Sequence, residues 1–283
     1  MIKTILIPVD GSANGATAVD YGIYIAPKLE ATLTGLHVID MYLIQGPLMT
    51  DISATVGMPP YDCFYEAVET SLKEKAVAVL KNFEDRCRTA GIACETKKNI
   101  GKISDTIIEE AESADLILMA KKGEHFHLKG GGLLGSVAEV VIRNSGKPVM
   151  VIPESFYEIE SMGLAYDGSA PARKALELSL DISVKARWPI TVIIITSDAK
   201  KAAELTSQVE EMNQKDNAED QADCEVIISA GREQDEILKF IAEGAVELMV
   251  IGAYGNNRLR EWLLGSTTSH IIHKSPIPVL LIR

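Results

Sequence analysis

The stretch "ELMVIGAYGNNRLREWLLGSTTSHIIHKSPIPVLLI" (residues 247–282) indicates the fold class of this chain. It opens with a short apolar run, continues through a glycine-rich loop into a helical pattern, and ends in a second apolar run. Short apolar runs that alternate with helical segments are typical of parallel strands joined by helices. The stretch therefore predicts a strand–loop–helix–strand unit of an α/β protein.

Much of this unit occurs a second time, earlier in the chain. "LLGSVAEVVI" (133–142) matches "LLGSTTSHII" (263–272), and "ILIPVDGSANGATAVDYG" (5–22) matches "MGLAYDGSAPARKALELS" (162–179). Three further landmarks repeat in the same order, so chance is a poor explanation. The chain therefore contains two copies of one domain, residues 1–153 and 162–283. The segment 153–161 joins them, and the first copy carries an insertion at 41–65.

Each copy is long enough for five strands. In the first copy the expected strands are 4–9, 31–39, 94–99, 116–120 and 148–152. The segment 71–83 has helical spacing, with one apolar face that is expected to comprise Leu72, Ala76, Val77, Val79 and Leu80. The pattern predicts two doubly wound domains, each a five-stranded parallel sheet with helices on both faces. Such sheets bind ligands at the carboxyl ends of their strands.

Composition narrows the class of protein. The 283 residues are 47% hydrophobic and carry a formal net charge of −12, so nucleic acid is not an expected partner. No apolar run reaches the ~18 residues of a membrane span, and the N-terminus lacks the pattern of a signal peptide. The cysteines, Cys63, Cys87, Cys94 and Cys224, have no zinc-site spacing and are expected to be reduced thiols in the cytoplasm.

The glycines of the opening stretch fit an anion-binding loop. Gly252 ends the buried strand, Gly255 follows, and Gly265, Ser266 and Thr267 open the next helix. Glycines allow close approach of the backbone, and a helix start offers N–H groups and a positive dipole end, so phosphate is the expected ligand. The alternative is an ordinary helix cap after a strand end. The loop is neither the dinucleotide fingerprint nor a P-loop.

A second short loop, "YDGS", follows the first strand of the same copy. It is expected at the neighbouring strand end, where the carboxylate of Asp167 is placed to hold a base or a ribose hydroxyl. On local grounds alone, Asp167 is equally a helix N-cap.

The order of these motifs resembles the universal stress proteins. The shared pattern is a first strand ending in DGS, then G-2x-G-9x-G-S/T before the last helix, then PVLLI at the end, and it covers nearly the whole chain. The resemblance implies an adenine nucleotide alpha hydrolase-like fold and pairing of the two copies through their last strands, as in a homodimer. It also implies binding of ATP or AMP, with or without a bound Mg²⁺ ion. Further association of two chains stays open. When the family's motif positions are matched to the second copy, the implied site residues are Asp167, Ile195, Gly252, Gly255, Gly265, Ser266 and Thr267.

The first copy departs from this pattern. Its matching positions are Pro8, Asp10 and Val38 on the adenosine side and Ala120, Gly123, Gly135, Ser136 and Val137 on the phosphate side. Its loop is two residues longer and more basic, with Lys121, Lys122, His125, His127 and Lys129. Three alternatives stay open for this loop. The changes strengthen phosphate binding, adapt the loop to another anion, or leave the loop without a function. We expect unequal sites, with the segment 41–65 as a loop or lid and a helix beginning near Tyr61.

The histidines and arginines near these loops do not by themselves predict a metal or catalytic site. His125 and His127 are spaced for zinc, but no third ligand is near. His270 and His273 are expected to face solvent or a neighbouring element. Arg258 and Arg260 are within reach of phosphates, yet no acidic pair stands out for Mg²⁺. The sequence therefore favours nucleotide binding with little or no turnover. The alternatives are a slow ATP hydrolase or a nucleotidyl or phosphoryl transferase, and a dimerisation scaffold with empty pockets.

Overall fold

A computed structural model describes residues 1–45, 62–123, 134–214, 221–252 and 265–283. The first half contains β1 (Thr4–Pro8), α1 (Ala13–Leu29), β2 (Thr32–Asp40), α2 (Met41–Gln45), α4 (Asp62–Thr89), β3 (Cys94–Gly101), α5 (Ile103–Ala111), β4 (Leu116–Ala120), α6 (Ser136–Asn144) and β5 (Val149–Ile152). The second half contains β6 (Met162–Ala165), α7 (Ala170–Ala186), β7 (Ile190–Ile195), α8 (Ala199–Asn213), β8 (Cys224–Ser229), α9 (Glu233–Ala242), β9 (Leu248–Gly252), α10 (Ser266–Lys274) and β10 (Val279–Ile282).

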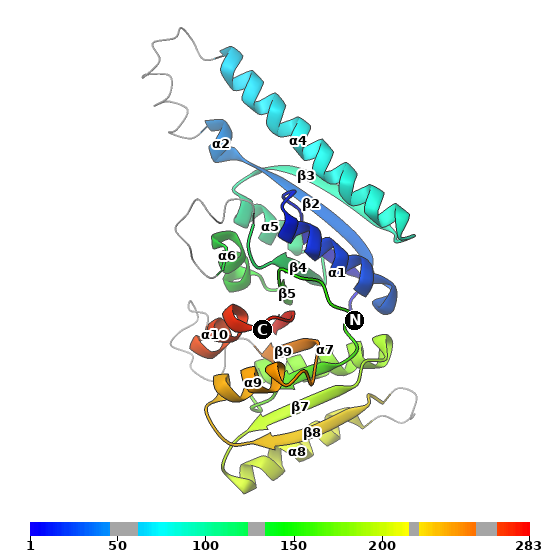
Figure 1. Ribbon diagram of the computed structural model, residues 1–283, viewed down its shortest axis with the longest axis vertical. Helices are drawn as coiled ribbons and strands as arrows, with labels where there is room; N and C mark the ends of the chain where they lie inside the picture. The colour runs from blue at the N-terminus through cyan, green and yellow to red at the C-terminus, as the bar shows by residue number, and fades with distance from the viewer. Residues whose placement is uncertain (46–61, 124–133, 215–220, 253–264) are drawn as a thin grey trace.

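The strands of both halves form one continuous sheet of ten strands (Figure 1). Its order is β3-β2-β1-β4-β5-β10-β9-β6-β7-β8, so each half is a five-stranded parallel sheet, as predicted. Among the described strands, only β5 and β10 pair antiparallel, with Val279 opposite Val151 and Leu281 opposite Val149. The predicted pairing of the last strands is therefore confirmed. It removes the two apolar sheet edges that the halves would otherwise expose.

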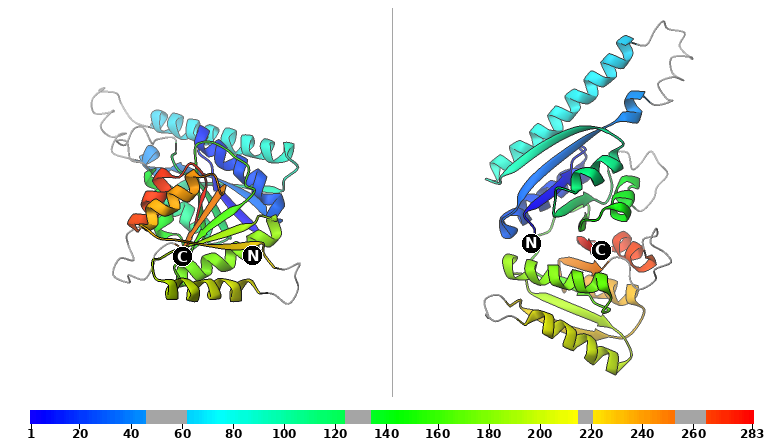
Figure 2. Two further views of the ribbon diagram at one scale, coloured as in Figure 1. Left: turned by 60° about the horizontal axis from the view of Figure 1, so that its bottom comes forward. Right: turned by 180° about the vertical axis from the view of Figure 1, so that it is seen from behind.

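Helices cover both faces of this sheet (Figure 2). Strand β1 shows why: Ile5 and Ile7 enter one core while Leu6 enters the other, because side chains alternate across a strand. The first core lies under α1, α4, α7 and α8, and the second under α5, α6, α9 and α10. Each core contains residues from both halves. The doubly wound architecture is therefore confirmed, and the two halves share their hydrophobic cores.

Helix α4 follows the insertion of the first half. It begins at Asp62, close to the predicted start at Tyr61, while residues 46–61 of the predicted loop or lid lie outside the described residues. One residue of its predicted apolar face is wrong, because Val77 is 56% exposed. The face that meets the sheet instead continues through Leu80 and Phe83, and Val77 falls beyond its edge.

The segment between the halves is fixed to α1. The Tyr24 hydroxyl donates to the Ile159 carbonyl at 2.7 Å, and the Tyr157 N–H donates to the Tyr21 hydroxyl at 3.1 Å. The Tyr24 ring also stacks on Trp188 of the second half, with centroids 6.2 Å apart. The joint between the copies is thus an ordered, aromatic contact rather than a free linker.

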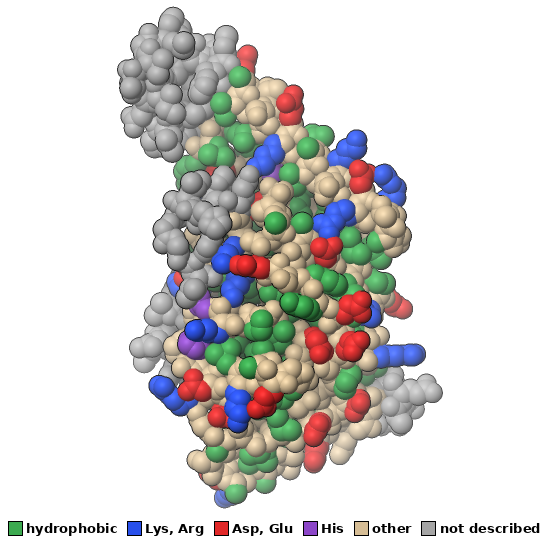
Figure 3. Space-filling model, viewed as in Figure 1, with side chains coloured by type: hydrophobic (Ala, Val, Ile, Leu, Met, Phe, Trp, Pro, Cys, Tyr) green, Lys and Arg blue, Asp and Glu red, His purple; other side chains and the backbone are tan. Residues whose placement is uncertain are grey.

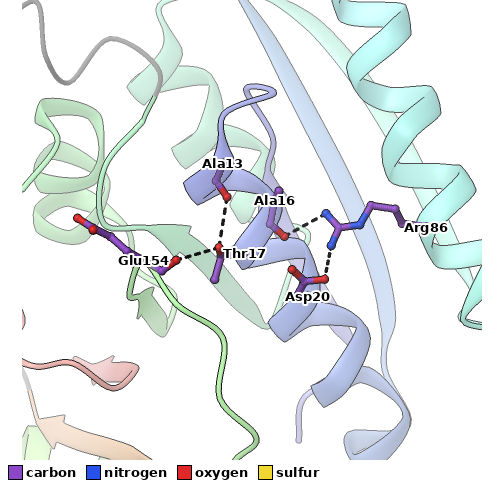
Figure 4. Close-up of polar contacts among 6 residues, drawn as sticks. All are labelled: Ala13, Ala16, Thr17, Asp20, Arg86 and Glu154. Carbon is purple, nitrogen blue, oxygen red and sulfur yellow. Dashed lines mark hydrogen bonds and ion pairs between the residues drawn. The ribbon is translucent and has the colours of Figure 1, made fainter.

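Polar contacts on α1 extend this arrangement (Figure 4). The Thr17 hydroxyl lies 3.2 Å from the carbonyl of Glu154 in the joint. On the other side of α1, Arg86 of α4 donates to the Ala16 carbonyl at 3.0 Å and pairs with Asp20. Figure 3 shows acidic and basic side chains interspersed over the described face of the molecule. Within the described parts of the chain, no helix is both long enough and apolar enough to cross a bilayer.

Candidate functional site

The predicted site residues that the structure describes lie at the carboxyl ends of the strands or at the helix starts that follow them. In the first half, Asp10 follows β1 and lies within the turn that begins α1. Its Oδ1 accepts from the Ser12 N–H at 2.9 Å and from the Ser12 hydroxyl at 2.6 Å. Ser12 is the N-cap of α1, since its Oγ accepts from the Gly15 N–H at 3.0 Å. The turn thus fixes the Asp10 carboxylate at the strand end.

The two phosphate-side glycines of the first half lie next to this carboxylate. A Cβ built on Gly123 would lie 3.1 Å from Oδ2 of Asp10, and one built on Gly135 would lie 3.6 Å from the Gly123 nitrogen. The Gly135 N–H donates to the Lys121 carbonyl at 2.9 Å. The two ends of the longer loop therefore meet beside Asp10, while residues 124–133, with His125, His127 and Lys129, lie outside the described residues.

The two described lysines of this loop bind protein groups. Lys121 Nζ donates to the His273 carbonyl, in the last turn of α10, at 2.7 Å, and burial lowers the pKa of Lys121. A cation at a helix C-terminus is favoured by the helix dipole. Lys122 Nζ pairs with the Glu154 carboxylate at 2.5 Å. Lys121 and Lys122 therefore link the first loop to the second half and to the joint, and the effect of the loop's basic residues on phosphate binding stays a prediction.

The second half has the same turn after β6. Asp167 Oδ1 accepts from the Ser169 N–H at 2.9 Å, and Ser169 is the N-cap of α7. The alternative that Asp167 itself caps the helix is wrong, because Ser169 performs this role. Gly168 between them has φ +78°, and a Cβ there would lie 2.6 Å from Leu205 of α8, so this position requires glycine.

Gly252, the first glycine of the second loop, has a packing role that sequence reasoning missed. A Cβ on Gly252 would lie 2.6 Å from the Ala172 nitrogen and 2.7 Å from the Pro171 carbonyl carbon. The start of α7 thus lies directly against the end of β9. In the first half, Ala120 takes the place of Gly252, and Gly15 takes the place of Ala172. A Cβ on Gly15 would lie 2.7 Å from the Asp10 carboxylate, and the contacts of the described residues give no structural explanation for Ala120.

The start of α10 is open. Gly265 is its N-cap, with no side-chain capping bond, and Ser266 follows as an exposed residue and Thr267 as a half-buried one. A Cβ on Gly265 would meet only the Thr268 hydroxyl, at 3.8 Å. Helix α6 starts in the same way, at Gly135 with Ser136 and Val137. The first-turn N–H groups of both helices therefore have no side-chain acceptor within the described residues. Gly255, Arg258 and Arg260 lie outside them.

The adenosine-side residues occupy corresponding positions in the two halves. Pro8 ends β1, Val38 lies near the end of β2 and Ile195 ends β7, each half-buried. Beside Val38, the buried His37 lies with its Nδ1 2.7 Å from the Val9 carbonyl, next to Asp10. Its counterpart in the repeat is Ile194. A polar residue in an apolar strand was the signal that could have identified this difference between the halves.

His273 of α10 and three cysteines are further reactive groups among the described residues. His273 Nδ1 is buried, and burial, then Lys121, lowers the pKa of its imidazole. This histidine faces a neighbouring element, one of the two predicted possibilities. Cys87, Cys94 and Cys224 are free thiols. Across the described residues, no group of three or more His, Cys, Asp and Glu side chains is arranged to hold a metal ion.

Known proteins with similar sequences identify the family of this chain. The model of the universal stress protein family matches residues 1–153 and 158–283. The chain belongs to the universal stress protein family. Universal stress protein Slr1230 of Synechocystis is 27% identical over 292 residues, covering all of both chains. The chain is therefore a tandem member of the family, with one family domain in each half.

A solved structure of a universal stress protein shares this architecture over both halves. A universal stress protein from Archaeoglobus fulgidus has a TM-score of 0.76 and 24% identity, covering 98% of this chain and 97% of its own. An Arabidopsis thaliana member whose structure has AMP bound aligns with 53% of this chain and 90% of its own, at 18% identity and a TM-score of 0.37. The first likeness extends over both halves and so supports the tandem fold.

Proposed function

We propose that the second half of this universal stress protein binds an adenine nucleotide, ATP or AMP, and acts through binding with little or no turnover. In this proposal Asp167 and Ile195 face the adenosine. The loop from Gly252 through Gly255 to Gly265, with Ser266 and Thr267, holds the phosphates.

The observation that carries the proposal is the open start of α10. Within the described residues, its first-turn N–H groups have no side-chain cap, and a Cβ on Gly265 would meet only the Thr268 hydroxyl, at 3.8 Å. Backbone N–H groups and a helix dipole together favour a phosphate at such a position. The Asp167 carboxylate, at the end of a strand that neighbours β9, supplies an acceptor for ribose hydroxyls.

The site of the first half differs from that of the second half in the groups that surround it. Asp10, Gly123 and Gly135 lie together, as a nucleotide site would require. However, its two described loop lysines are engaged with His273 and Glu154. We propose that this half binds the nucleotide more weakly than the second half, or not at all.

Binding is favoured over catalysis by the residues near the proposed phosphates. Phosphoryl transfer generally needs metal ligands, a positioned nucleophile and a charge-neutralising arm. Asp167 is placed on the adenosine side, and no metal-binding cluster occurs in the described part of the chain. The backbone donors of α10 fit a phosphate by themselves, and Mg²⁺ would have to be held chiefly by the nucleotide. The alternative is a slow ATP hydrolase, which measurement of phosphate release would detect.

Substitution of the first-strand aspartates tests the proposal directly. Asp167→Asn keeps an oxygen for the Ser169 N–H but removes the carboxylate charge, so the turn should survive while the ribose contact weakens. Asp10→Asn is the matched control in the first half. Equilibrium dialysis with radiolabelled ATP should show weaker binding for Asp167→Asn and a small effect for Asp10→Asn. Unchanged binding by Asp167→Asn would contradict the proposed adenosine site.

A further inference from the structure

We propose that Cys87 and Cys94 form a dithiol that hydrogen peroxide converts into an intramolecular disulfide. Cys94 is the first residue of β3, so the pair lies at the amino ends of the strands. The nucleotide site is proposed at the carboxyl ends of the strands, and the two proposals are therefore independent.

The packing of α4 on the sheet brings the two cysteines together. The Phe83 ring lies over Gly35 of β2, where a Cβ would be 2.6 Å from the ring. Cys87 is one helical turn after Phe83, on the same face of α4. Leu33 lies two residues before Gly35, on the same face of the sheet, and pairs with Cys94 of the next strand. Cys87 therefore lies over the Leu33–Cys94 pair, and both cysteines belong to the same hydrophobic cluster.

A tight turn between α4 and β3 holds this arrangement. Gly91 has φ +70°, and the Ile92 N–H donates to the Cys87 carbonyl at 2.9 Å. The backbone two residues before Cys94 is thus bonded to Cys87 itself. The thiols also interact: burial chiefly, and then the charge of Cys94 and a hydrogen bond with it, raise the pKa of Cys87 to about 12.

The difference in exposure assigns the two cysteines different roles. Cys94 is half-buried and within reach of a small oxidant, whereas Cys87 is fully buried. The Cys94 thiolate attacks one oxygen of hydrogen peroxide and breaks the O–O bond. With one proton this gives a sulfenic acid and water. The Cys87 sulfur then attacks the Cys94 sulfur, its proton leaves with the hydroxide as a second water, and the S–S bond forms. A thiol such as dithiothreitol supplies the electrons for the reverse reaction.

The second half supplies an internal control. Cys224 begins β8 at the position where Cys94 begins β3, and burial raises the pKa of Cys224 to about 11. Helix α8, which precedes β8, contains no cysteine. Cys224 therefore reproduces the location of Cys94 without the partner that α4 provides.

Peptide mapping of the full chain tests the inference. The protein is treated with hydrogen peroxide under native conditions, freed of peroxide, denatured in the presence of N-ethylmaleimide and cleaved after glutamate. Cleavage after Glu84 and Glu95 releases residues 85–95, "DRCRTAGIACE", with both cysteines in one peptide. We expect this peptide to lose two hydrogens, about 2 Da, and to escape alkylation. The Cys224 peptide should stay alkylated, and dithiothreitol should restore the 85–95 dithiol.

Variants separate the two steps. Cys94→Ser should leave Cys87 alkylated after denaturation, whereas Cys87→Ala should leave Cys94 as a sulfenic acid that dimedone traps. Cys224→Ser should behave as the wild type. The inference is overturned if the wild-type 85–95 peptide remains a dithiol or accumulates only sulfenic or sulfinic acid. It is also overturned if this peptide is cross-linked to Cys63 or Cys224, or if Cys224 is oxidised at the same peroxide dose.

Discussion

Replacement of Gly252 by alanine should destabilise the protein even when no nucleotide is present. The added Cβ would lie 2.6 Å from the Ala172 nitrogen and 2.7 Å from the Pro171 carbonyl carbon. Both are backbone atoms at the start of α7, so no side-chain rotation relieves the contact. Overpacking of this kind costs about 1–3 kcal/mol. A cost of about 2 kcal/mol corresponds to a fall in Tm of roughly 4–8 °C for a chain of this size class.

Gly265→Ala is the matched control for this prediction. Gly265 has φ −55°, and its Cβ would meet only the Thr268 hydroxyl at 3.8 Å. The control should change stability little, since alanine restricts the unfolded chain by about 0.4–1 kcal/mol but is a poorer N-cap than glycine. Differential scanning calorimetry of nucleotide-free protein measures both variants. If Gly252→Ala melts with the wild type, or if Gly265→Ala loses as much stability, the packing explanation of the first motif glycine is wrong.

Three further predictions concern the contact between the halves. Tyr24→Phe removes the hydroxyl that donates to the Ile159 carbonyl, and urea titration should show a loss of about 1 kcal/mol; unchanged stability would refute the role of this bond. Burial lowers the pKa of His273 below its usual 6.5, so the stability it contributes is present above that pH and lost as the pH falls through the lowered value. His273→Gln should flatten the fall of the urea midpoint below pH 6.5, and an unchanged fall would refute this role of the buried imidazole. Lys121→Met breaks the donor contact to the last turn of α10 and should lower Tm without weakening ATP binding by the second half; weaker binding would show that the halves are coupled there.

Much of the fold follows from the sequence because the repeat constrains it twice. The recurring apolar runs predict a five-stranded parallel sheet in each copy, and the resemblance to the universal stress proteins implies the pairing of the last strands, β5 and β10. The grouping of Asp10, Gly123 and Gly135 follows in the same way, since the carboxyl ends of parallel strands meet at one edge. Local sequence patterns were sufficient to predict which residues lie together wherever the topology of the sheet alone determines their positions.

Other features depend on contacts that no local pattern encodes. Gly252 is small because α7 approaches β9, which the sequence alone does not reveal. Lys121 is basic, but only the packed halves show that it reaches the last turn of α10. Cys87 and Cys94 lack the spacing of a metal site, and their proximity arises from the register of α4 on β2 and β3. These are tertiary effects, and they account for the errors and omissions in the sequence-based site.

The most direct test of the central proposal is isothermal titration calorimetry of ATP into three proteins: the wild type, Gly265→Val and Gly135→Val. A Cβ on either glycine would meet the described residues at no less than 3.5 Å, so each variant is expected to fold, while valine occupies the place proposed for a phosphate. The proposal predicts that binding is dominated by one site per chain, that Gly265→Val removes it, and that Gly135→Val leaves it nearly unchanged. Unchanged affinity in Gly265→Val would contradict the proposed phosphate site, and two equivalent sites, each weakened by the variant in its own half, would contradict the proposed asymmetry.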